Sequence, residues 1–313
     1  MTNKPSQQVC RPKGIVIFGP TASGKTALAV RLAKTLGGEV VNADSRQLYE
    51  GMTILTAAPT AEDMQGIPHH LFEILNPKEK ITATAYAEKA RACIRDILAR
   101  GKVPIVCGGT GFYLKVLFEG ISSIPTVCDD LQKDLRDTCT AKGGAAMLAE
   151  LKEVDPVIAE KLFEGDTQRI LRALGVYHQT GRPLSYFQSL PPEGGLTLPF
   201  LHVSLQPEKA WLDARIEKRF GLMEKAGVEA EMRTLKNAGY ALTDHGIQTL
   251  GAREFFQYFE DERSYESVAE DILLQTKQYA KRQLTWARTQ FKSDIILPNP
   301  CDDAESIIAA FQA

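Results

Sequence analysis

The sequence predicts an α/β fold in which helices cover both faces of a parallel sheet. From Gly14 to about Leu117, short apolar runs alternate with segments of helical periodicity, the pattern of strands joined by helical crossovers. The first apolar run leads into a glycine-rich turn that opens a helix, at 19–26. From Asp129 to about Ser189 only helical signals occur, which predicts a small all-helical domain inserted into the sheet domain.

The individual elements follow from hydrophobic periodicity and from glycine or proline at their ends. In the first part of the sheet domain we expect strand 15–18, helix 25–36, strand 39–43, a helix at about 82–100 and strand 103–107. In the insert we expect helices at 129–142, 144–154, 156–162 and 167–181. Strand 200–205 then resumes the sheet, and long helices follow at 208–227, 228–239 and 265–291. We therefore expect a loose tail at 1–13, a core formed by 14–118 and 200–313, and an inserted helical domain at 119–199.

Composition excludes several classes of protein. The chain has 313 residues, 44% of them hydrophobic and 24% charged, which is ordinary for a soluble globular protein. The net charge of −2 means that any nucleic acid must be bound by local basic surfaces. No apolar run approaches the ~20 residues of a membrane span, and the N-terminus lacks the apolar core of a secretion signal. The six cysteines form no C-x-x-C pair, so we expect reduced thiols, no zinc knuckle and a cytoplasmic location.

The glycine-rich turn matches the phosphate-binding pattern G-x-x-x-x-G-K-T. In this pattern backbone N–H groups converge on phosphate oxygens, the lysine adds a positive charge and the threonine hydroxyl ligates Mg²⁺. The buried strand before it and the helix after it are the expected context, so the fold is predicted to be P-loop NTPase-like. The predicted phosphate-binding residues are Gly19, Pro20, Thr21, Ala22, Ser23, Gly24, Lys25 and Thr26, with Thr26 also the metal ligand. The motif does not reveal which phosphate compound binds.

Two further turns follow strands of the same predicted sheet, where ligands of parallel sheets bind. Asp44 and Ser45 follow strand 39–43, and Thr110 lies in a glycine turn after strand 103–107. Asp44 is a candidate acid or base, but an aspartate before the helical-looking segment "RQLY" can equally be a helix cap. Thr110 can likewise be ordinary turn chemistry.

Basic clusters form the next signal. On the last long helix, Lys277, Lys281 and Arg288 share one face, while Tyr279, Arg282 and Trp286 share another. Interleaved cations and aromatics can grip phosphates and stack bases, although an amphipathic helix with Trp286 in the core and a solvated basic face reads the same.

Three smaller polar groups complete the inventory. Gln168, Arg169 and Arg172 cluster on a helix of the insert. Arg215 and Arg219 lie one turn apart and can clamp an anion or simply be solvated. His69 and His70 have no third metal ligand nearby, and we interpret them as structural.

Taken together, these stretches resemble the tRNA dimethylallyltransferases, also called tRNA isopentenyltransferases. The stretches that carry the resemblance are "GPTASGKT" at 19–26, "ADSRQLYEGM" at 43–52, "TAAP" at 56–59, "PHHLFEI" at 68–74, "CGGTGFYL" at 107–114, "DTQRILRALGVY" at 166–177, "RIEKRF" at 215–220, "GIQTLGARE" at 246–254 and "YAKRQLTW" at 279–286. They occur in the family's order over nearly the whole chain. The eukaryotic members' C-terminal zinc finger is absent, so the bacterial type is the closer match.

The resemblance implies a reaction and a role for each candidate residue. The family transfers a dimethylallyl group from dimethylallyl diphosphate to the exocyclic amine of the adenosine 3′ of the tRNA anticodon. By resemblance, Lys25 and Thr26 bind diphosphate and Mg²⁺, Asp44 is the base, Thr110 assists, and Arg215 or Arg219 stabilises the leaving diphosphate. The residues implied to contact the tRNA anticodon arm are Asp44, Ser45, Arg46, Gln47, Thr110, Gln132, Gln168, Arg169, Arg172, Thr249, Gly251, Arg253, Lys277, Lys281, Arg282 and Gln283. We expect a monomer with no membrane partner.

The chain departs from the family pattern in places. The family's G-T-A-K-P reads Leu55 to Pro59 here, without the glycine and the lysine, and Gln132, Ala252 and other positions also differ. These changes concern tRNA contact and leave the proposed chemistry intact. Two other functions stay open from the residues alone. One is a P-loop small-molecule kinase or adenylate prenyltransferase, and the other is an RNA-binding protein with a vestigial loop.

Overall fold

The computed structural model describes residues 11–260, 263–298 and 304–313. Most of the expected tail at 1–13 therefore lies outside the described residues. The chain divides into two compact units, one made of 1–118 with 196–313 and one made of Glu119–Gly195. The expected insert, 119–199, begins at the same residue as the smaller unit, whereas 196–199 fall in the larger one.

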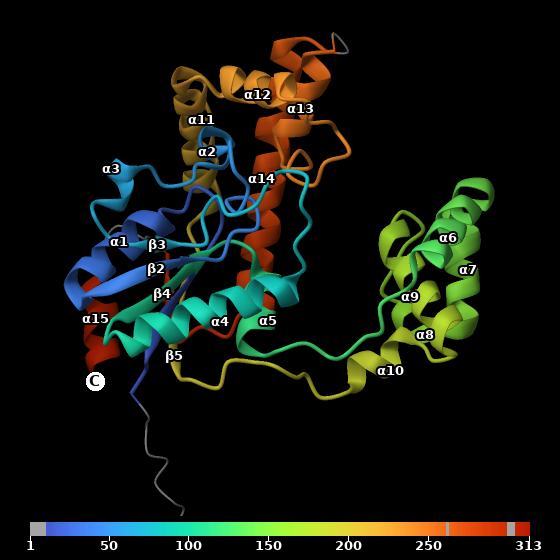
Figure 1. The fold of residues 1–313 in the computed structure, drawn as a ribbon, viewed down its shortest axis with the longest axis horizontal. Coiled ribbons are helices and arrows are strands. Elements are labelled where there is room, and N and C mark those ends of the chain that lie inside the picture. Colours follow the sequence, from blue (N-terminus) through green and yellow to red (C-terminus); the bar gives the residue numbers. More distant parts are fainter. Residues whose placement is uncertain (1–10, 261–262, 299–303) are drawn as a thin grey trace, which may run out of the picture. The chain divides into compact units, whose positions relative to one another are not determined.

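Within the described residues of the larger unit, six parallel strands form one sheet in the order β3-β2-β4-β1-β5-β6 (Figure 1). The strands are β1 (Gly14–Phe18), β2 (Gly38–Asn42), β3 (His69–His70), β4 (Val103–Gly108), β5 (Phe200–Leu205) and β6 (Ile295–Leu297). The central strand β1 is buried along its whole length, and Ile15 pairs with Ile105 of β4 and Leu201 of β5. Strands that are buried on both faces have continuous apolar sequences, which is why the longer strands could be predicted from the sequence. The predicted α/β, P-loop-like fold is confirmed.

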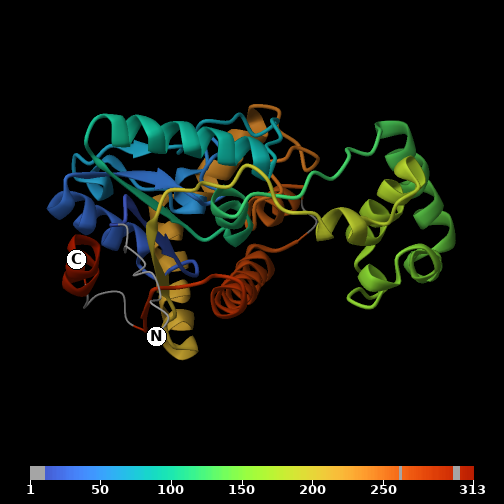
Figure 2. The same ribbon diagram turned by 90° about the horizontal axis from the view of Figure 1, so that it is seen from below.

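Helices cover both faces of this sheet (Figure 2). On one face lie α1 (Lys25–Leu36) and α15 (Ala304–Gln312), whose Leu28, Leu32 and Ile307 join the core beneath the strands. The other face is covered by α4 (Ala83–Ala99) and α5 (Gly111–Phe118), with the rings of Tyr86 and Tyr113 stacked at 4.1 Å. This double layer holds the carboxyl ends of β1, β2 and β4 in fixed register.

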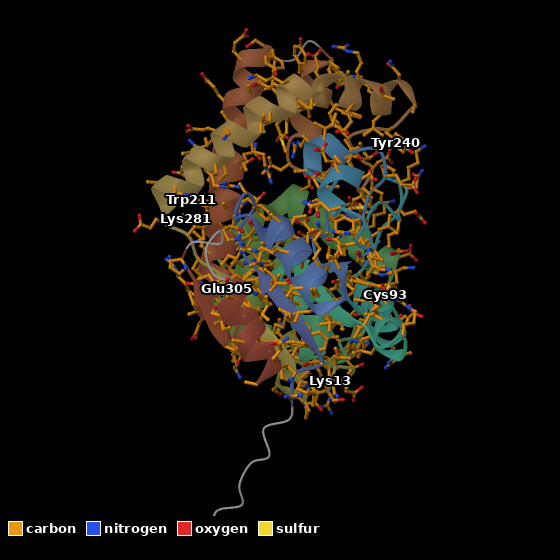
Figure 3. All side chains as sticks on the ribbon, turned by 90° about the vertical axis from the view of Figure 1, so that its left-hand side faces the viewer. Lys13, Cys93, Trp211, Tyr240, Lys281 and Glu305 are labelled. Carbon is orange, nitrogen blue, oxygen red and sulfur yellow. The ribbon has the colours of Figure 1, made fainter. Side chains whose placement is uncertain are left out.

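A second group of helices stands beyond the strand ends. It comprises α11 (Lys209–Ala226), α12 (Val228–Asn237), α13 (Ala252–Tyr258) and α14 (Tyr265–Thr289). Leu212 and Ile216 of α11 pack against Ala280 and Leu284 of α14, and Figure 3 labels Trp211 and Lys281 on these two helices. Both are amphipathic helices whose apolar stripes face each other.

Apart from the expected helix at 156–162, the predicted elements agree with the observed bounds to within about two residues, but several elements were missed. The sequence analysis did not predict α2 (Thr53–Thr56), α3 (Ala61–Met64), α5, α10 (Leu184–Ser189), α13, β3, β6 or α15. Several of these have only two to four residues, too few for a periodicity to register. None of the described helices has the length and apolarity that crossing a membrane requires.

The smaller unit is helical throughout its regular elements. It contains α6 (Asp129–Lys142), α7 (Gly144–Val154), α8 (Pro156–Ala159), α9 (Thr167–Thr180) and α10 (Leu184–Ser189). Its core, including Met147, Leu151, Ile170 and Leu174, is built from its own residues. The expected helix at 156–162 is wrong in length, because the chain leaves α8 in tight turns after Ala159.

Candidate active site

The phosphate loop joins β1 to α1. Gly24, with a φ of 91°, precedes the first residue of α1, and no side chain caps that helix end. The first turn of a helix leaves backbone N–H groups without intrahelical partners, so this end is an anion-binding geometry. Lys25 curls back over the loop and its Nζ donates to the Pro20 carbonyl at 2.6 Å.

Cations from two elements surround this loop. Lys25 is half-buried, and this burial lowers its pKa, while Cys107 and Asp44 nearby act in the opposite direction. Burial also lowers the pKa of Arg219 to about 10, with Asp44 opposing and Arg215 adding to the shift. Arg215 is exposed, donates from Nε to the Ala22 carbonyl at 2.9 Å and lies over the Trp211 ring. Two half-buried cations held close together favour a bound anion.

Asp44 lies just beyond the end of β2, in a turn. Its backbone N–H donates to Asn42 Oδ1 at 2.8 Å, and its own Oδ1 accepts from the Arg46 N–H at 2.9 Å. The segment "RQLY" is not helical, so the helix-cap interpretation of Asp44 is wrong in that form. The carboxylate closes a local turn instead, which is a typical use of an aspartate side chain.

Thr110 contacts Ser45, the residue after Asp44, across the ends of the strands. Its Oγ1 accepts from the Ser45 N–H at 2.9 Å and donates to Ser45 Oγ at 3.2 Å. Tyr279 on α14 lies close enough to Thr110 for that side chain to influence its pKa, and burial, together with the charge of Asp44, raises the pKa of Tyr279 to about 12. The two turns predicted from strand ends are thus connected to each other and to the last long helix.

Two cavities meet at these residues. One, of about 520 Å³, is lined by the phosphate loop, including Lys25 and Thr26, and by Arg215. The other, of about 410 Å³, lies among α11, α13 and α14 and is lined by Arg46, Tyr279 and Arg282. The residues that line both are Thr21, Asp44, Thr56, Arg219 and Met223. Asp44 therefore faces the phosphate-loop cavity on one side and a polar, aromatic-bearing cavity on the other.

Several residues expected to contact tRNA lie at the second cavity. Arg46, Thr249, Arg253 and Arg282 line it, and Arg253 and Arg282 are also exposed. Gly251 directly precedes α13 with a φ of 94°, and its N–H donates to the buried Glu254 at 2.8 Å. This part of the predicted surface is gathered in one place by the fold.

Other expected contacts are occupied within the protein. Gln47 donates from Nε2 to the carbonyls of Thr56 and Ala57, and Lys277 forms an ion pair with Glu217 at 2.6 Å. Gln283 is only 4% exposed and bonds to backbone atoms on both sides. Lys281 is exposed on the same helix. For Gln283 the expectation of a surface contact disagrees with the structure, because its helix face points into the protein.

The family profile described as IPP transferase matches residues 47–290. The chain belongs to the IPP transferase family. It is 41% identical over 278 residues to the tRNA dimethylallyltransferase of Parvibaculum lavamentivorans, covering 89% of this chain and 88% of that one. It is 40% identical over 300 residues to the Geobacter metallireducens protein of that name, covering 95% and 96%.

Solved structures of IPP transferases have the same fold. The tRNA isopentenylpyrophosphate transferase of Bacillus halodurans has a TM-score of 0.68 and 30% identity, covering 96% of this chain and 95% of that one. A eukaryotic dimethylallyltransferase, described as acting on tRNA, has a TM-score of 0.78 and 29% identity, covering 95% and 77%. The resemblance inferred from the sequence motifs is confirmed.

In the smaller unit of this IPP transferase, the expected contacts are mixed. Gln168 is exposed, and Arg169 is 73% exposed although it pairs with Asp166 at 3.6 Å. Arg172 is exposed and donates to the Pro125 carbonyl at 3.2 Å. Gln132 instead donates from Nε2 to the Val127 carbonyl at 2.7 Å, just before the start of its own helix, α6. The two arginines thus remain accessible.

The histidines behave as structural residues. His70 lies within 2.8 Å of the buried Glu39, which also binds Arg100, and this network lowers the pKa of Glu39 to about 2. His69 bonds to the Ile67 carbonyl, and burial lowers its pKa. No group of three or more His, Cys, Asp or Glu suited to a metal ion occurs among the described residues.

Two polar residues of the site were not predicted by the sequence analysis. Glu231 on α12 accepts from the N–H groups of Ile54 and Leu55 and so anchors α2, a wall of both cavities. Glu254 lines the second cavity from α13. Each is a single acid on an amphipathic helix, and nothing in its local pattern distinguishes it from a solvated glutamate.

Proposed function

We propose that this chain transfers the dimethylallyl group of dimethylallyl diphosphate to the exocyclic amine of the adenosine 3′-adjacent to the anticodon of tRNA, releasing diphosphate. The observation that carries the proposal is the position of Asp44, which lines both the phosphate-loop cavity and the second cavity. The relatives named tRNA dimethylallyltransferase support the same reaction. A carboxylate between the two substrates suits a direct transfer from one to the other.

In the proposed reaction the adenine nitrogen attacks the allylic carbon, while the bond from that carbon to the diphosphate oxygen breaks. The electron pair of that bond leaves with diphosphate, and the amine proton passes to the Asp44 carboxylate. An adenine amine is a weak nucleophile, and stacked within the anticodon loop it cannot reach the donor, so the base must be turned out into a pocket. The second cavity, with Tyr279 and Arg282 in its lining, is our proposed site for this base. Proton removal by a positioned carboxylate then raises the reactivity of the amine.

The leaving diphosphate gains negative charge as the carbon–oxygen bond breaks. Lys25, Arg219 and the N–H groups at the start of α1 are the proposed stabilising groups, with Arg215 at the cavity's edge. Because Lys25 and Arg219 are half-buried, their interaction with this charge is screened less than it would be at an exposed surface.

Thr26 fits a magnesium ion that arrives with the substrate. It lines the phosphate-loop cavity beside Lys25, and Asp44 lines the same cavity. Mg²⁺ binds with one or two protein oxygens and substrate phosphates, keeping several waters, which is the donor set available here. When bound, the ion would offset charge on the diphosphate.

The proposed partners follow from this chemistry. We propose that tRNA binds through Arg46, Arg253, Lys281 and Arg282 of the larger unit and through Arg169 and Arg172 of the smaller one, with Ser45, Thr249 and Gln168 as polar contacts. A cytoplasmic location is proposed because tRNA is the substrate. The monomeric state stays a prediction.

The deciding experiment separates prenyl transfer from kinase chemistry. Purified protein should bind dimethylallyl diphosphate in the presence of Mg²⁺ and attach its five-carbon group to tRNA transcripts, as read by mass analysis of the nucleosides. ATP hydrolysis should be negligible, because β4 ends in Cys107 and Gly108 rather than in the acidic residue a P-loop ATPase uses. Rapid ATP turnover without any prenyl transfer would contradict the proposal.

A further inference from the structure

Gln283 occupies an unusual position for a residue of a basic helix. It lies on α14, only 4% exposed, between two turns of the active site. Its Oε1 accepts from the backbone N–H of Thr21 in the phosphate loop at 2.8 Å. Its Nε2 donates to the carbonyl of Gly109, in the turn that carries Thr110, also at 2.8 Å. One side chain thus joins two loops whose positions determine the geometry of the reaction.

Only a primary amide of this length satisfies both partners. The oxygen must face an N–H and the nitrogen must face a carbonyl, so the orientation of the amide follows from its surroundings. A glutamate at 283 has no donor for Gly109, and a methionine has neither donor nor acceptor for the two backbone groups. Leaving a buried backbone group unpaired costs more than the bond itself contributes.

The turn at Gly109 is shaped around this side chain. A Cβ added at Gly109 would lie 2.2 Å from Gln283 Nε2 and 3.3 Å from the Gly19 carbonyl oxygen. The absence of a side chain at Gly109 therefore lets the phosphate loop, the second glycine turn and the amide approach one another closely.

The same helix reaches the second cavity. Thr276, Tyr279 and Gln283 are spaced by three and four residues, so they follow one face of α14. Thr276 and Tyr279 line the cavity proposed for the nucleobase, and Tyr279 lies close enough to Thr110 for that side chain to influence its pKa. A shift of this face would move the two loops with it.

We infer that Gln283 is a positioning residue that sets the phosphate loop against the Thr110 turn, and that it does not contact RNA. It acts through the Thr21 N–H and the Gly109 carbonyl, not by touching a substrate. The expected effect on the rate of prenyl transfer rests on the proposed function. The expected effect on diphosphate affinity does not, because the shape of the phosphate loop matters for binding any phosphate.

The test compares Gln283→Met with Gln278→Met. Gln278 is an exposed glutamine of the same helix, so its replacement is a matched control. Calorimetry with inorganic diphosphate and Mg²⁺ should show an affinity roughly tenfold lower for Gln283→Met and unchanged for the control. Misplacement of the loop should also lower single-turnover transfer roughly 10- to 100-fold. Affinity for an anticodon stem-loop RNA, and its dependence on salt, should stay as in the unaltered protein.

Gln283→Asn guards against simple unfolding. Asparagine keeps the amide but is one carbon shorter, so it can reach at most one of the two backbone partners. The diphosphate affinity of Gln283→Asn should therefore lie between that of the unaltered protein and that of Gln283→Met. Melting curves establish that each variant is folded. If RNA affinity fell while diphosphate affinity held, Gln283 would be an RNA contact and the inference would be wrong. If neither changed in a folded variant, the residue would serve stability alone. If the unaltered protein bound diphosphate but transferred nothing, the proposed function would fail while the positioning role stood.

Discussion

Asp44 shows how one side chain can serve both local structure and chemistry. One carboxylate oxygen accepts from the Arg46 N–H and closes the turn after β2. The residue also lines both cavities, close enough to Lys25, Arg219 and Tyr279 to affect the pKa of each. These two roles can be separated, because an amide oxygen accepts the turn bond as well as a carboxylate does but cannot take a proton from the amine.

We expect Asp44→Asn to remove the base and to leave the turn in place. Single-turnover prenyl transfer should fall by about 10²- to 10⁴-fold, the usual effect of losing a general base. The melting temperature and the affinity for diphosphate should stay close to those of the unaltered protein. Asp244→Asn is the matched control, since Asp244 also accepts from a backbone N–H, that of Ala241, but lines neither cavity. Near-normal transfer by Asp44→Asn would contradict the role of Asp44 as the base and leave it only the role of closing the turn.

At the scale of elements, α2 shows how a four-residue helix is held in place by distant side chains. Glu231 on α12 accepts from the N–H groups of Ile54 and Leu55 at 2.7 and 2.9 Å, at the start of α2. Gln47 donates to the carbonyls of Thr56 and Ala57 at its other end. So short a helix has little stability of its own. Its position, and therefore one wall of both cavities, depends on these two residues.

Glu231→Gln should lower kcat/KM for transfer roughly 5- to 20-fold, because an amide has one acceptor oxygen where the carboxylate uses two. Glu229→Gln on the same helix removes only an ion pair with Arg233 and should leave transfer unchanged. If both variants matched the unaltered protein, the anchoring of α2 would have no bearing on the reaction.

The same carboxylate predicts a pH effect. Burial raises the pKa of Glu231, opposed by the N–H groups it binds. As pH falls through this raised pKa the carboxyl group loses an acceptor oxygen, so activity should decline in the unaltered protein and not in Glu231→Gln. The folded state takes up the proton before the unfolded state does, so this group makes the free energy of unfolding rise as pH falls between the two pKa values. The free energy of unfolding, measured at several pH values for the unaltered protein and for Glu231→Gln, checks this direction, because the difference between the two series isolates the effect of Glu231.

At the scale of the whole molecule, RNA binding must rest on local charge. The net charge of −2 gives no general attraction for a polyanion. Exposed arginines occur in each unit, at Arg253 and Arg282 in the larger one and at Arg169 and Arg172 in the smaller one. The smaller unit has a core of its own, so it can be altered at its surface without disturbing the cavities.

Replacing Arg169 and Arg172 together by alanine should weaken tRNA binding and reduce its salt dependence. Each phosphate contact adds roughly 0.7–0.9 to the slope of log K against log salt, so two contacts account for about 1.5. Filter binding at several salt concentrations measures this, with the exposed Arg95 of α4 replaced by alanine as control. Diphosphate affinity should be unaffected. An equal loss of diphosphate affinity would mean that the unit has a different task.

The long elements and the phosphate loop were predictable from sequence because their signals are local. Buried parallel strands are continuous apolar runs, and α1, α4, α11 and α14 have helical periodicity. The segment "RQLY" was misread, because a short run without glycine or proline looks helical in isolation while the Asp44 turn and the strand end impose another path. Strands β3 and β6 were missed because two or three residues form strands here only by pairing with β2 and β5.

The sequence alone determined the fold class and the family and located the phosphate-loop motif, since each follows from the order and spacing of residues along the chain. Only the tertiary structure decided that Asp44 lies between two cavities, that Glu231 anchors α2, and that Gln283 joins Thr21 to Gly109. Gln283 is 262 residues from one partner and 174 from the other. A contact over such separations depends on how helices pack against strand ends, and no local pattern of the chain encodes it.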